Sequence, residues 1–254
     1  MCGQVLYNNI NFYALFTGLD GYMKVAVLQS NYIPWKGYFD IIHDVELFIF
    51  HDDLQYTKND WRNRNRIVTE GGPKWLTVPV GTDEHRLILD VTMQDAAWAK
   101  KHIDMIRASY RKAPYYAQLM PFLEETYLGR TWTRLYELDR YLIERICHDF
   151  LGVTTRFSDS RDFATHGVKH EKLLSILQSA GASTYVSGPA AKDYIRAEDY
   201  REAGIELVWK DYGGYPAYPQ LHGQAFDHYV SIIDLLMNTG ADAPYYIWGW
   251  REEK

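Results

Sequence analysis

The chain has 254 residues and a formal net charge of -6, so it carries no overall positive charge that would attract it to nucleic acid. Hydrophobic residues make up 47% and charged residues 24%, which is typical of globular proteins and excludes a disordered, collagenous or coiled-coil chain. The only cysteines, Cys2 and Cys147, form no CxxC or Cys/His pattern. Neither a disulfide framework nor a cysteine zinc site is indicated, and a reducing cytoplasm is the expected setting.

The first 22 residues have no basic start, no long apolar core and no A-x-A cleavage signal, so they do not resemble a secretory peptide. No stretch of the chain approaches the roughly 20 apolar residues that a membrane-spanning helix needs. A strand-like run begins at Met23-Lys24. We therefore expect residues 1–22 to be an N-terminal extension, with Met23 as a candidate native start, and residues 23–254 to form a single α/β domain.

The pattern after Met23 is that of a strand, a helix and a second strand. Residues 24–29 are a β-branched run, residues 35–43 have helical spacing, and residues 47–50 are continuously apolar. Strands that are apolar throughout are typical of a parallel sheet covered on both faces. We predict a Rossmann-like β-α-β unit, followed by a strand at residues 75–80 that Pro79 confines to an edge or a strand end.

The middle third predicts a helical block at about residues 91–151. Apolar residues recur at spacings of three and four, with Pro114 and Gly129 between the helices. The three helices are expected at residues 96–110, 115–127 and 132–151.

Strands and helices alternate again after this block. Gly181, Gly204 and Gly240 stand where helix C-termini should fall, since glycine accepts the left-handed conformation. The sequence therefore predicts an α/β fold with a mainly parallel sheet and a helical insertion. The late strands are expected at residues 155–157, 184–186 and 206–209, and the late helices at residues 170–180, 190–203 and 226–239.

Polar and aromatic side chains gather after the first two predicted strands. The carboxyl ends of parallel strands form the ligand crevice of an open sheet, so both groups should face one site. The candidate substrate- and phosphate-binding residues there are Gln29, Tyr32, Trp35, Lys36, Gln55, Tyr56, Lys58, Trp61, Arg62, Asn63 and Arg64.

Asp52 and Asp53 directly follow the second strand and are the candidate catalytic pair. One of them would act as a general base, or they would bind Mg²⁺ together with substrate phosphate. Lys58, Arg62 and Arg64 would hold that phosphate. In the alternative interpretation, an aspartate only caps the turn and pairs with arginine.

The segments LQSNYIPWKGYFDII, HDDLQYTKNDWRNRNRI and WLTVPV follow one another as they do in the WbqC-like protein family, which this chain resembles. The later segments RKAPYY, GASTYVSGPAAKDYI, YPQLHG and SIIDLLMNTG extend the resemblance over nearly all of residues 23–238. Ser30 departs from the family's frequent proline. The resemblance implies an association with O-antigen and related polysaccharide gene clusters, without a settled reaction.

A weaker similarity links the first loop to nucleotidyltransferases of the HxGH class. Gly37 and the layout match, but Trp35 and Tyr38 occupy the positions of the two histidines, so the histidine role is missing. Ser187 and Gly188 come before a predicted helix, whose first N–H groups could bind an anion. An ordinary capped β-to-α turn is the alternative there.

The loop YPAYPQLHG supplies Tyr218 and Gln220 as candidate substrate-binding residues and His222 as a candidate acid or base. The motifs HExxH, GxSxG, GxGxxG and GxxxxGK[ST] are absent from the sequence. A catalytic zinc, a hydrolase triad, a dinucleotide fingerprint and a P-loop are therefore not indicated.

The sequence leaves three functions open. The first is a transferase that moves a glycosyl, acyl, aminoacyl or nucleotidyl group from a nucleotide-activated sugar or an ATP-activated donor. The second is a non-catalytic protein that binds a glycan or nucleotide sugar by stacking it on Trp35, Tyr56 and Trp61. The third is a scaffold for other biosynthetic enzymes, which would not require so many polar groups near two strand ends.

Overall fold

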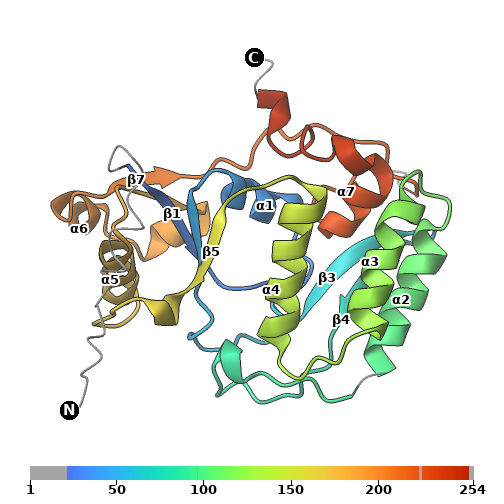
Figure 1. Ribbon diagram of the computed structural model, residues 1–254, viewed down its shortest axis with the longest axis horizontal. Coiled ribbons are helices and arrows are strands. Elements are labelled where there is room, and N and C mark those ends of the chain that lie inside the picture. Colours follow the sequence, from blue (N-terminus) through green and yellow to red (C-terminus); the bar gives the residue numbers. More distant parts are fainter. Residues whose placement is uncertain (1–21, 96, 223–224, 252–254) are drawn as a thin grey trace, which may run out of the picture.

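The computed structural model describes residues 22–95, 97–222 and 225–251. Five strands form one parallel sheet in the order β5-β2-β1-β6-β7 (Figure 1). They are β1 (Lys24–Leu28), β2 (Leu47–Phe50), β5 (Arg156–Asp159), β6 (Thr184–Ser187) and β7 (Glu206–Trp209). The predicted α/β class with a mainly parallel, Rossmann-like sheet is confirmed. The expectation about residues 1–22 concerns, apart from Tyr22, residues outside the described ranges, and it stays a prediction.

Both faces of the sheet are covered, which explains the unbroken apolar run of β2. Val27 and Ile49 belong to a cluster with the helices α5 (His170–Ala180) and α6 (Ala197–Glu202). Phe48 and Phe50 belong to the main core, which also contains buried residues of α1 (Lys36–His43). Because both faces of β2 are buried, its sequence does not alternate between polar and apolar residues.

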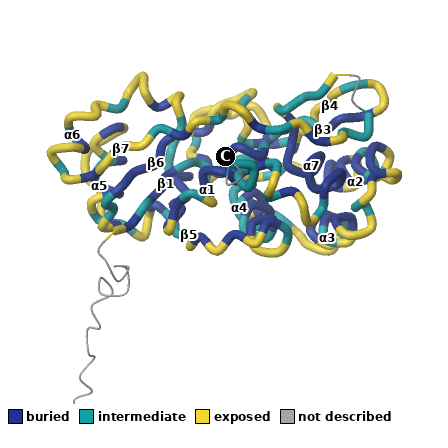
Figure 2. The backbone as a smooth tube through the Cα atoms, turned by 90° about the horizontal axis from the view of Figure 1, so that it is seen from above, coloured by how far each residue is buried: buried dark blue, intermediate teal, exposed yellow. Residues whose placement is uncertain are grey.

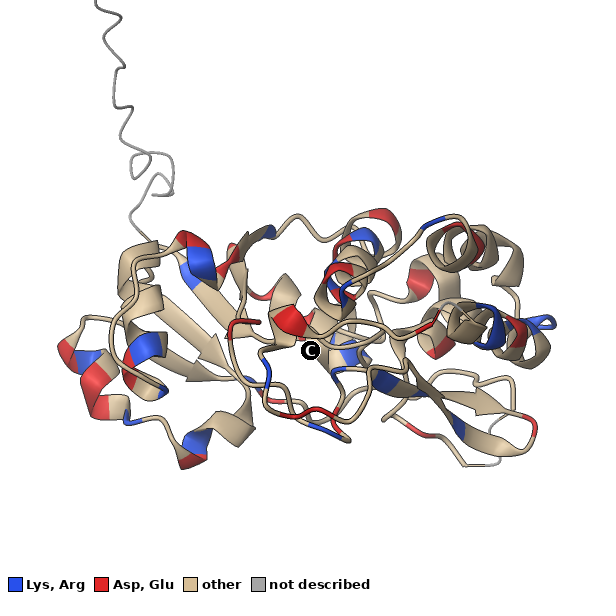
Figure 3. Ribbon diagram, turned by 90° about the horizontal axis from the view of Figure 1, so that it is seen from below, with Lys and Arg blue, Asp and Glu red and all other residues tan. Residues whose placement is uncertain are grey.

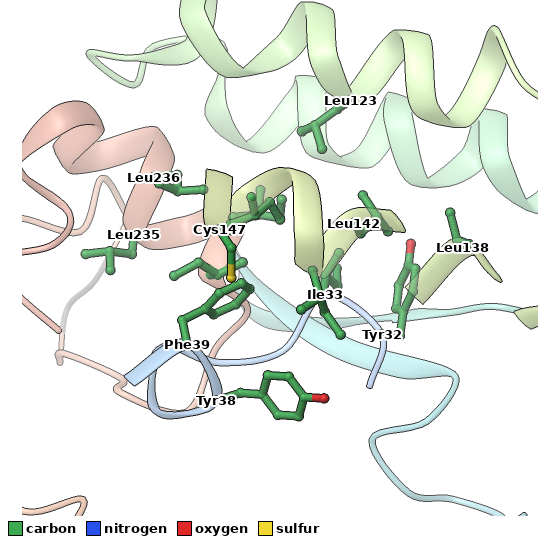
Figure 4. Packing of buried hydrophobic residues seen from close by; sticks show 14 of the residues in the cluster. Tyr32, Ile33, Tyr38, Phe39, Leu123, Leu138, Leu142, Cys147, Leu235 and Leu236 are labelled. Carbon is green, nitrogen blue, oxygen red and sulfur yellow. The ribbon is translucent and has the colours of Figure 1, made fainter. Parts of the chain in front are cut away.

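The main core extends from the sheet into the helices that follow it. These are α2 (Ala97–Tyr110), α3 (Tyr116–Leu128), α4 (Leu135–Arg145) with a π-helical turn (Ile146–Phe150), and α7 (Ile232–Thr239). Tyr32 and Ile33 point from the loop after β1 toward Leu138 and Leu142 of α4 (Figure 4). The loop that should carry the site is thus anchored in the core. In the described part of the chain, no helix is long and apolar enough to span a bilayer.

The hairpin of β3 (Arg64–Thr69) and β4 (Gly72–Thr77) corrects one prediction. The strand expected at residues 75–80 instead spans residues 72–77 and pairs antiparallel with β3, outside the parallel sheet. Residues 78–80 are not in a strand. We did not predict β3, because polar residues occupy both faces of its first half, where Arg64, Asn65 and Arg66 follow one another.

Two late helices also differ from the prediction. The helix expected at residues 190–203 is a five-residue 3₁₀ helix (Pro189–Asp193) followed by α6, because Arg196 is extended between them. The helix expected at residues 226–239 begins only after Ser231, whose hydroxyl caps it by accepting from the Ile233 N–H at 3.2 Å. Gly181, Gly204 and Gly240 have the expected positive φ. Among the described residues, the other short 3₁₀ helices are Ile88–Asp90, Ser160–Asp162, Gly240–Asp242 and Gly249–Arg251.

Candidate functional site

The strand order reverses between β1 and β6. From β1 the chain adds β2 and β5 on one side, and it then crosses to add β6 and β7 on the other. Ligands of doubly wound sheets bind at this switch point, outside the carboxyl ends of the strands. The loop of residues 29–35, which joins β1 to α1, starts at that point, so we expect a ligand site there.

Asp52 is completely buried and paired. Its Oδ1 accepts from the Ser30 N–H at 2.7 Å, and its Oδ2 accepts from Nε of Arg140 at 2.7 Å. Arg140 also donates from Nη1 to Oδ2 of Asp159 at 2.5 Å. Asp52 thereby ties the loop after β1 to helix α4 and to the end of β5.

Asp53 is partly exposed and lies in a different network. Its Oδ1 accepts from the Ser160 hydroxyl at 2.5 Å, and its Oδ2 accepts from the ammonium of Lys172. Burial opposes ionisation, but the hydrogen bonds from Lys172 and Ser160 and the nearby His51 hold the pKa of Asp53 below its usual value. Burial lowers the pKa of His51, whose Nε2 lies 3.5 Å from Oδ1 of Asp53. Asp53 is therefore an ionised carboxylate beside a neutral imidazole at pH 7.

The structure limits how the two aspartates could hold Mg²⁺. Within residues 22–95, 97–222 and 225–251, no group of three or more His, Cys, Asp or Glu side chains is arranged as a metal site. A cation at Asp52 would have to displace Arg140 from a fully buried position, and a cation at Asp53 would have to displace Lys172 but could reach the carboxylate from solvent. Asp53 with substrate phosphate is the arrangement that remains compatible with the predicted Mg²⁺.

Arg62 joins the loop after β1 to the hairpin. Its Nη2 donates to Oε1 of Gln29 at 2.5 Å, and its Nη1 donates to Oδ1 of Asn31. Asp60 lies 3.7 Å from Nη2. The backbone N–H of Tyr32 also donates to the carbonyl of Trp61 at 3.0 Å. These contacts bring together the two segments that the sequence predicts as one crevice.

At the start of the hairpin, the arginines and the asparagines lie on opposite faces. Asn63 and Asn65 are buried, and their amides donate to Val78 O at 2.8 Å and Ile33 O at 2.9 Å. The guanidinium carbons of Arg64 and Arg66 lie 4.5 and 5.7 Å from the Trp75 ring centroid. Figure 3 shows the basic residues of this hairpin. Its outer face is basic and aromatic.

The predicted residues Gln55, Tyr56 and Lys58 have local partners. Lys58 Nζ lies 3.3 Å from Oε1 of Glu84, and the Gln55 amide donates to Glu84 O at 3.3 Å. The Tyr56 hydroxyl donates to Oδ1 of Asn63 at 3.1 Å, and its ring is buried. Tyr56 has no exposed face on which a glycan ring could stack.

An aromatic pocket of about 310 Å³ adjoins the loop after β1. Its rim is open, because Trp61 is 43% and Tyr229 63% exposed. The Trp35 ring lies over Gly37, where a Cβ atom would come within 2.3 Å of it, so only glycine fits there. The size suits one sugar ring or nucleobase. The aromatic pocket is lined by Asn31, Pro34, Trp35, Trp61, Asn65 and Tyr229.

Lys36 is a buried cation at the start of α1, and only 3% of it is exposed. Its Nζ donates to Pro216 O at 3.3 Å and lies 4.9 Å from the Tyr215 ring centroid and 5.4 Å from that of Tyr218. Burial lowers its pKa to about 8, although nearby Asp40 opposes the shift. No ion pair between Lys36 and a carboxylate occurs in the described ranges, so a bound anion could supply the missing counter-charge.

Tyr32 lies in the core. It is fully buried, and its hydroxyl bonds Nδ1 of His102 at 2.8 Å and the hydroxyl of Tyr127 at 2.5 Å.

Asp139 is a fully buried carboxyl of helix α4. Its burial and, to a smaller extent, the nearby charge of Asp52 raise its pKa well above the usual value, while Arg62 acts in the opposite direction. Burial therefore opposes ionisation of this carboxyl behind the site.

Ser187 ends β6 beside the switch point, and Gly188 follows it before the next helix. Ser187 is buried, and its hydroxyl donates to that of Tyr185 at 3.2 Å. The helix after Gly188 has only the five residues Pro189–Asp193, so its dipole is much weaker than that of the long helix predicted there. The anion-binding role of these two residues stays a prediction.

Tyr218, Gln220 and His222 make internal hydrogen bonds. The Tyr218 hydroxyl and the Gln220 amide donate to Oδ2 of Asp234 at 2.7 and 2.9 Å, and Asp234 is fully buried. Nε2 of His222 lies 2.6 Å from Ser109 O. Of these three residues, Tyr218 is the one whose ring lies near Lys36, which also contacts Tyr215 and Pro216 O of the same loop.

Several residues of the site are absent from the sequence-based prediction. Arg140 and Lys172 lie 88 and 119 residues after their aspartate partners, and no local pattern could have linked them. Arginine and asparagine alternate at residues 62–66 with the period of a strand, so Arg66 could have been placed on a strand face. Trp75 is its partner on the second strand of the hairpin. Tyr229 has no comparable signal.

The comparisons with known proteins identify the family of the chain. The model of the WbqC-like protein family matches residues 29–246. The chain is 45% identical over 226 residues to "Uncharacterized protein Rv1507c" of Mycobacterium tuberculosis (strain ATCC 25618 / H37Rv), an alignment that covers 88% of this chain and 97% of that protein. No solved structure matches the chain. With the family model spanning both the β1 loop and the hairpin, the chain belongs to the WbqC-like protein family.

Proposed function

We propose that this protein is a transferase that acts on a nucleotide-activated sugar in the assembly of bacterial surface polysaccharide. Membership of the WbqC-like family supports the setting, because the family is associated with polysaccharide gene clusters. The contacts of the first loop support the type of ligand. An ATP-activated donor would use the same phosphate-binding groups.

One observation carries the proposal. Within eight residues after β1, the chain supplies Gln29 and Asn31, which hold Arg62, then Trp35, which lines the aromatic pocket, and then Lys36. A nucleotide sugar combines a flat ring with a charged diphosphate. The aromatic pocket and Arg62, which the pocket residue Asn31 holds, match that combination, and the loop after β1 starts at the switch point where such ligands bind.

Asp53 is a better candidate than Asp52 for the reacting carboxylate. Asp52 is fully buried against Arg140, while 19% of the Asp53 side chain is exposed. A transferase needs a group that takes a proton from the acceptor hydroxyl, and this group must reach it directly or through one water. In this proposal Asp53 is that base or binds Mg²⁺ with the donor phosphates.

A ligand screen tests the proposal. Thermal unfolding would be recorded with UDP-, GDP-, dTDP- and CMP-sugars and with ATP, each with and without Mg²⁺. A ligand at a hundred times its dissociation constant stabilises the folded state by about 2.7 kcal/mol. Trp61→Ala should abolish the shift, and Tyr245→Ala, which removes an aromatic ring of similar exposure outside the pocket, should not. If none of these ligands stabilises the wild-type protein, the proposal is wrong.

A non-catalytic glycan-binding protein is the second candidate, and the exposed rings of Trp61 and Tyr229 favour it. The two candidates differ in turnover. A transferase incubated with its donor and an acceptor releases the nucleotide, which chromatography detects. A binding protein retains the ligand unchanged.

A further inference from the structure

Two arginines and a tryptophan form one stacked group on the outer face of the hairpin. In the antiparallel register Arg66 pairs with Trp75, and the guanidinium carbon of Arg64 lies only 4.5 Å from the Trp75 ring centroid. Trp75 itself is 44% exposed. The arginines leave much of the indole uncovered, at a place where the molecule meets solvent. In Figure 2 this hairpin lies at the periphery of the molecule.

Trp61 connects this group to the aromatic pocket. Its ring centroid lies 5.6 Å from that of Trp75 at an interplanar angle of 37°, and the same residue lines the pocket. We name Trp61, Trp75, Arg64 and Arg66 the tryptophan strip. The pocket and the strip form one aromatic surface, since they share Trp61.

The strip carries spare positive charge. No carboxylate lies within ion-pair distance of Arg64 in the described ranges, and its Nη atoms bond Asn59. Arg66 lies 3.4 Å from Asp227 and donates to Tyr229 O at 2.8 Å. Asp60, the other acid nearby, accepts from Thr57 and lies beside Arg62. Asp60 and Asp227 therefore face three guanidinium groups, those of Arg62, Arg64 and Arg66, which leaves one positive charge in excess.

We propose that the tryptophan strip binds an acidic glycan chain that extends outward from the aromatic pocket. Indole faces stack on the apolar faces of sugar rings, and guanidinium groups bind carboxylates or phosphates in a bidentate manner. The terminal ring of the glycan lies against Trp61 at the rim of the pocket, the next ring lies on Trp75, and Arg64 pairs with an anionic substituent. The description of this glycan as the acceptor rests on the proposed transferase function, whereas its binding does not.

Glycan chains of defined length and charge provide the test. Galacturonic acid oligomers of one to four rings and neutral maltose oligomers of the same lengths would be titrated calorimetrically at low salt, without any nucleotide. Affinity for the acidic series should rise with length. Trp75→Ala should lower affinity for the four-ring acid about tenfold and leave the single ring unaffected. Arg64→Gln should remove the preference for the acidic series.

Folding and alternative ligands are controlled separately. Trp75→Tyr keeps a flat ring and should retain most of the length dependence if Trp75→Ala destabilises the hairpin. Tyr245→Ala should change no affinity. The proposal is overturned if the wild-type protein binds neither series, if affinity does not depend on length, or if a ten-residue oligothymidylate binds more tightly than the acidic glycan. Acidic glycan binding by a protein that ignores every nucleotide sugar would refute the transferase and leave the strip proposal standing.

Discussion

Arg140 holds Asp52 and Asp159 together: its Nε lies 2.7 Å from Oδ2 of Asp52, and its Nη1 lies 2.5 Å from Oδ2 of Asp159. The ends of β2 and β5 are therefore joined through helix α4. Burial opposes ionisation of Asp159, but hydrogen bonds from Arg161 and Arg140 keep its pKa well below the usual value. Since Asp159 stays charged, Arg140 keeps one partner when Asp52 is replaced.

The first prediction follows from this pairing. Asp52→Asn should lower the free energy of unfolding by about 3 kcal/mol, because it breaks a buried ion pair. Urea denaturation measures the loss. Asp104→Asn, which removes an exposed carboxylate from a surface ion pair, should change stability little. A variant at Asp52 that unfolds like wild type but no longer turns over would show a catalytic role instead.

The second prediction concerns Asp53. Asp53→Asn should keep the fold, since the side chain is partly exposed, and should lower turnover by about a hundredfold or more if Asp53 is the general base. If Asp53 binds Mg²⁺, added Mg²⁺ should restore part of the rate, and donor affinity should fall as well. Turnover and melting temperature would be measured together. A destabilised variant with the wild-type rate per folded molecule would assign Asp53 to structure alone.

The parallel sheet could be predicted from β1 and β2, which are short and nearly continuous apolar runs, as in Leu47–Phe50. The hairpin was only half predicted, since Arg64–Thr69 buries Asn65 where an apolar residue is expected. The two aspartates could be placed at a strand end but not assigned partners, which come from helices far along the chain. The burial of Tyr32 was also hidden, because its loop has no periodicity that distinguishes inward from outward side chains.

The third prediction compares two buried lysines. Lys210 lies 2.8 Å from Oδ1 of Asp40 and also pairs with Asp44, whereas Lys36 lacks such a partner among the described residues. The pKa of Lys36 is about 8 in the folded protein, below the ordinary value of 10.5. Between these values the unfolded chain keeps the proton that the folded protein releases, so the free energy of unfolding rises with pH.

Lys36→Met removes this dependence. The wild-type protein should gain stability relative to Lys36→Met by about 1 kcal/mol per pH unit as the pH rises above 8, and below that pH the difference should be constant. Urea denaturation at several pH values measures it. Lys210→Met should instead destabilise the protein by leaving buried Asp40 short of a partner. If the difference in the free energy of unfolding between wild type and Lys36→Met does not change with pH, the pKa of Lys36 is not near 8.

The last prediction concerns Gly37, which lies under the Trp35 ring. A Cβ at this position would stand 2.3 Å from the indole, and the ring also contacts Tyr212 and Tyr229 at centroid distances of 5.3 and 5.7 Å. Gly37→Ala must therefore move Trp35 out of its place in the wall of the aromatic pocket. We expect a loss of about 1 to 3 kcal/mol in stability from this overpacking.

Ligand affinity should fall more than stability if Trp35 positions the donor. Calorimetric titration of Gly37→Ala with the donor found in the screen, alongside urea denaturation, separates the two effects. Gly71→Ala is the matched control, because a Cβ there meets only the Thr69 hydroxyl at 3.9 Å and lies in the β3–β4 turn. Unchanged donor affinity in a folded Gly37→Ala protein would exclude Trp35 from the donor site. Gly37 would then serve packing alone, and the donor would have to bind through Arg62 and Lys36 without an aromatic wall.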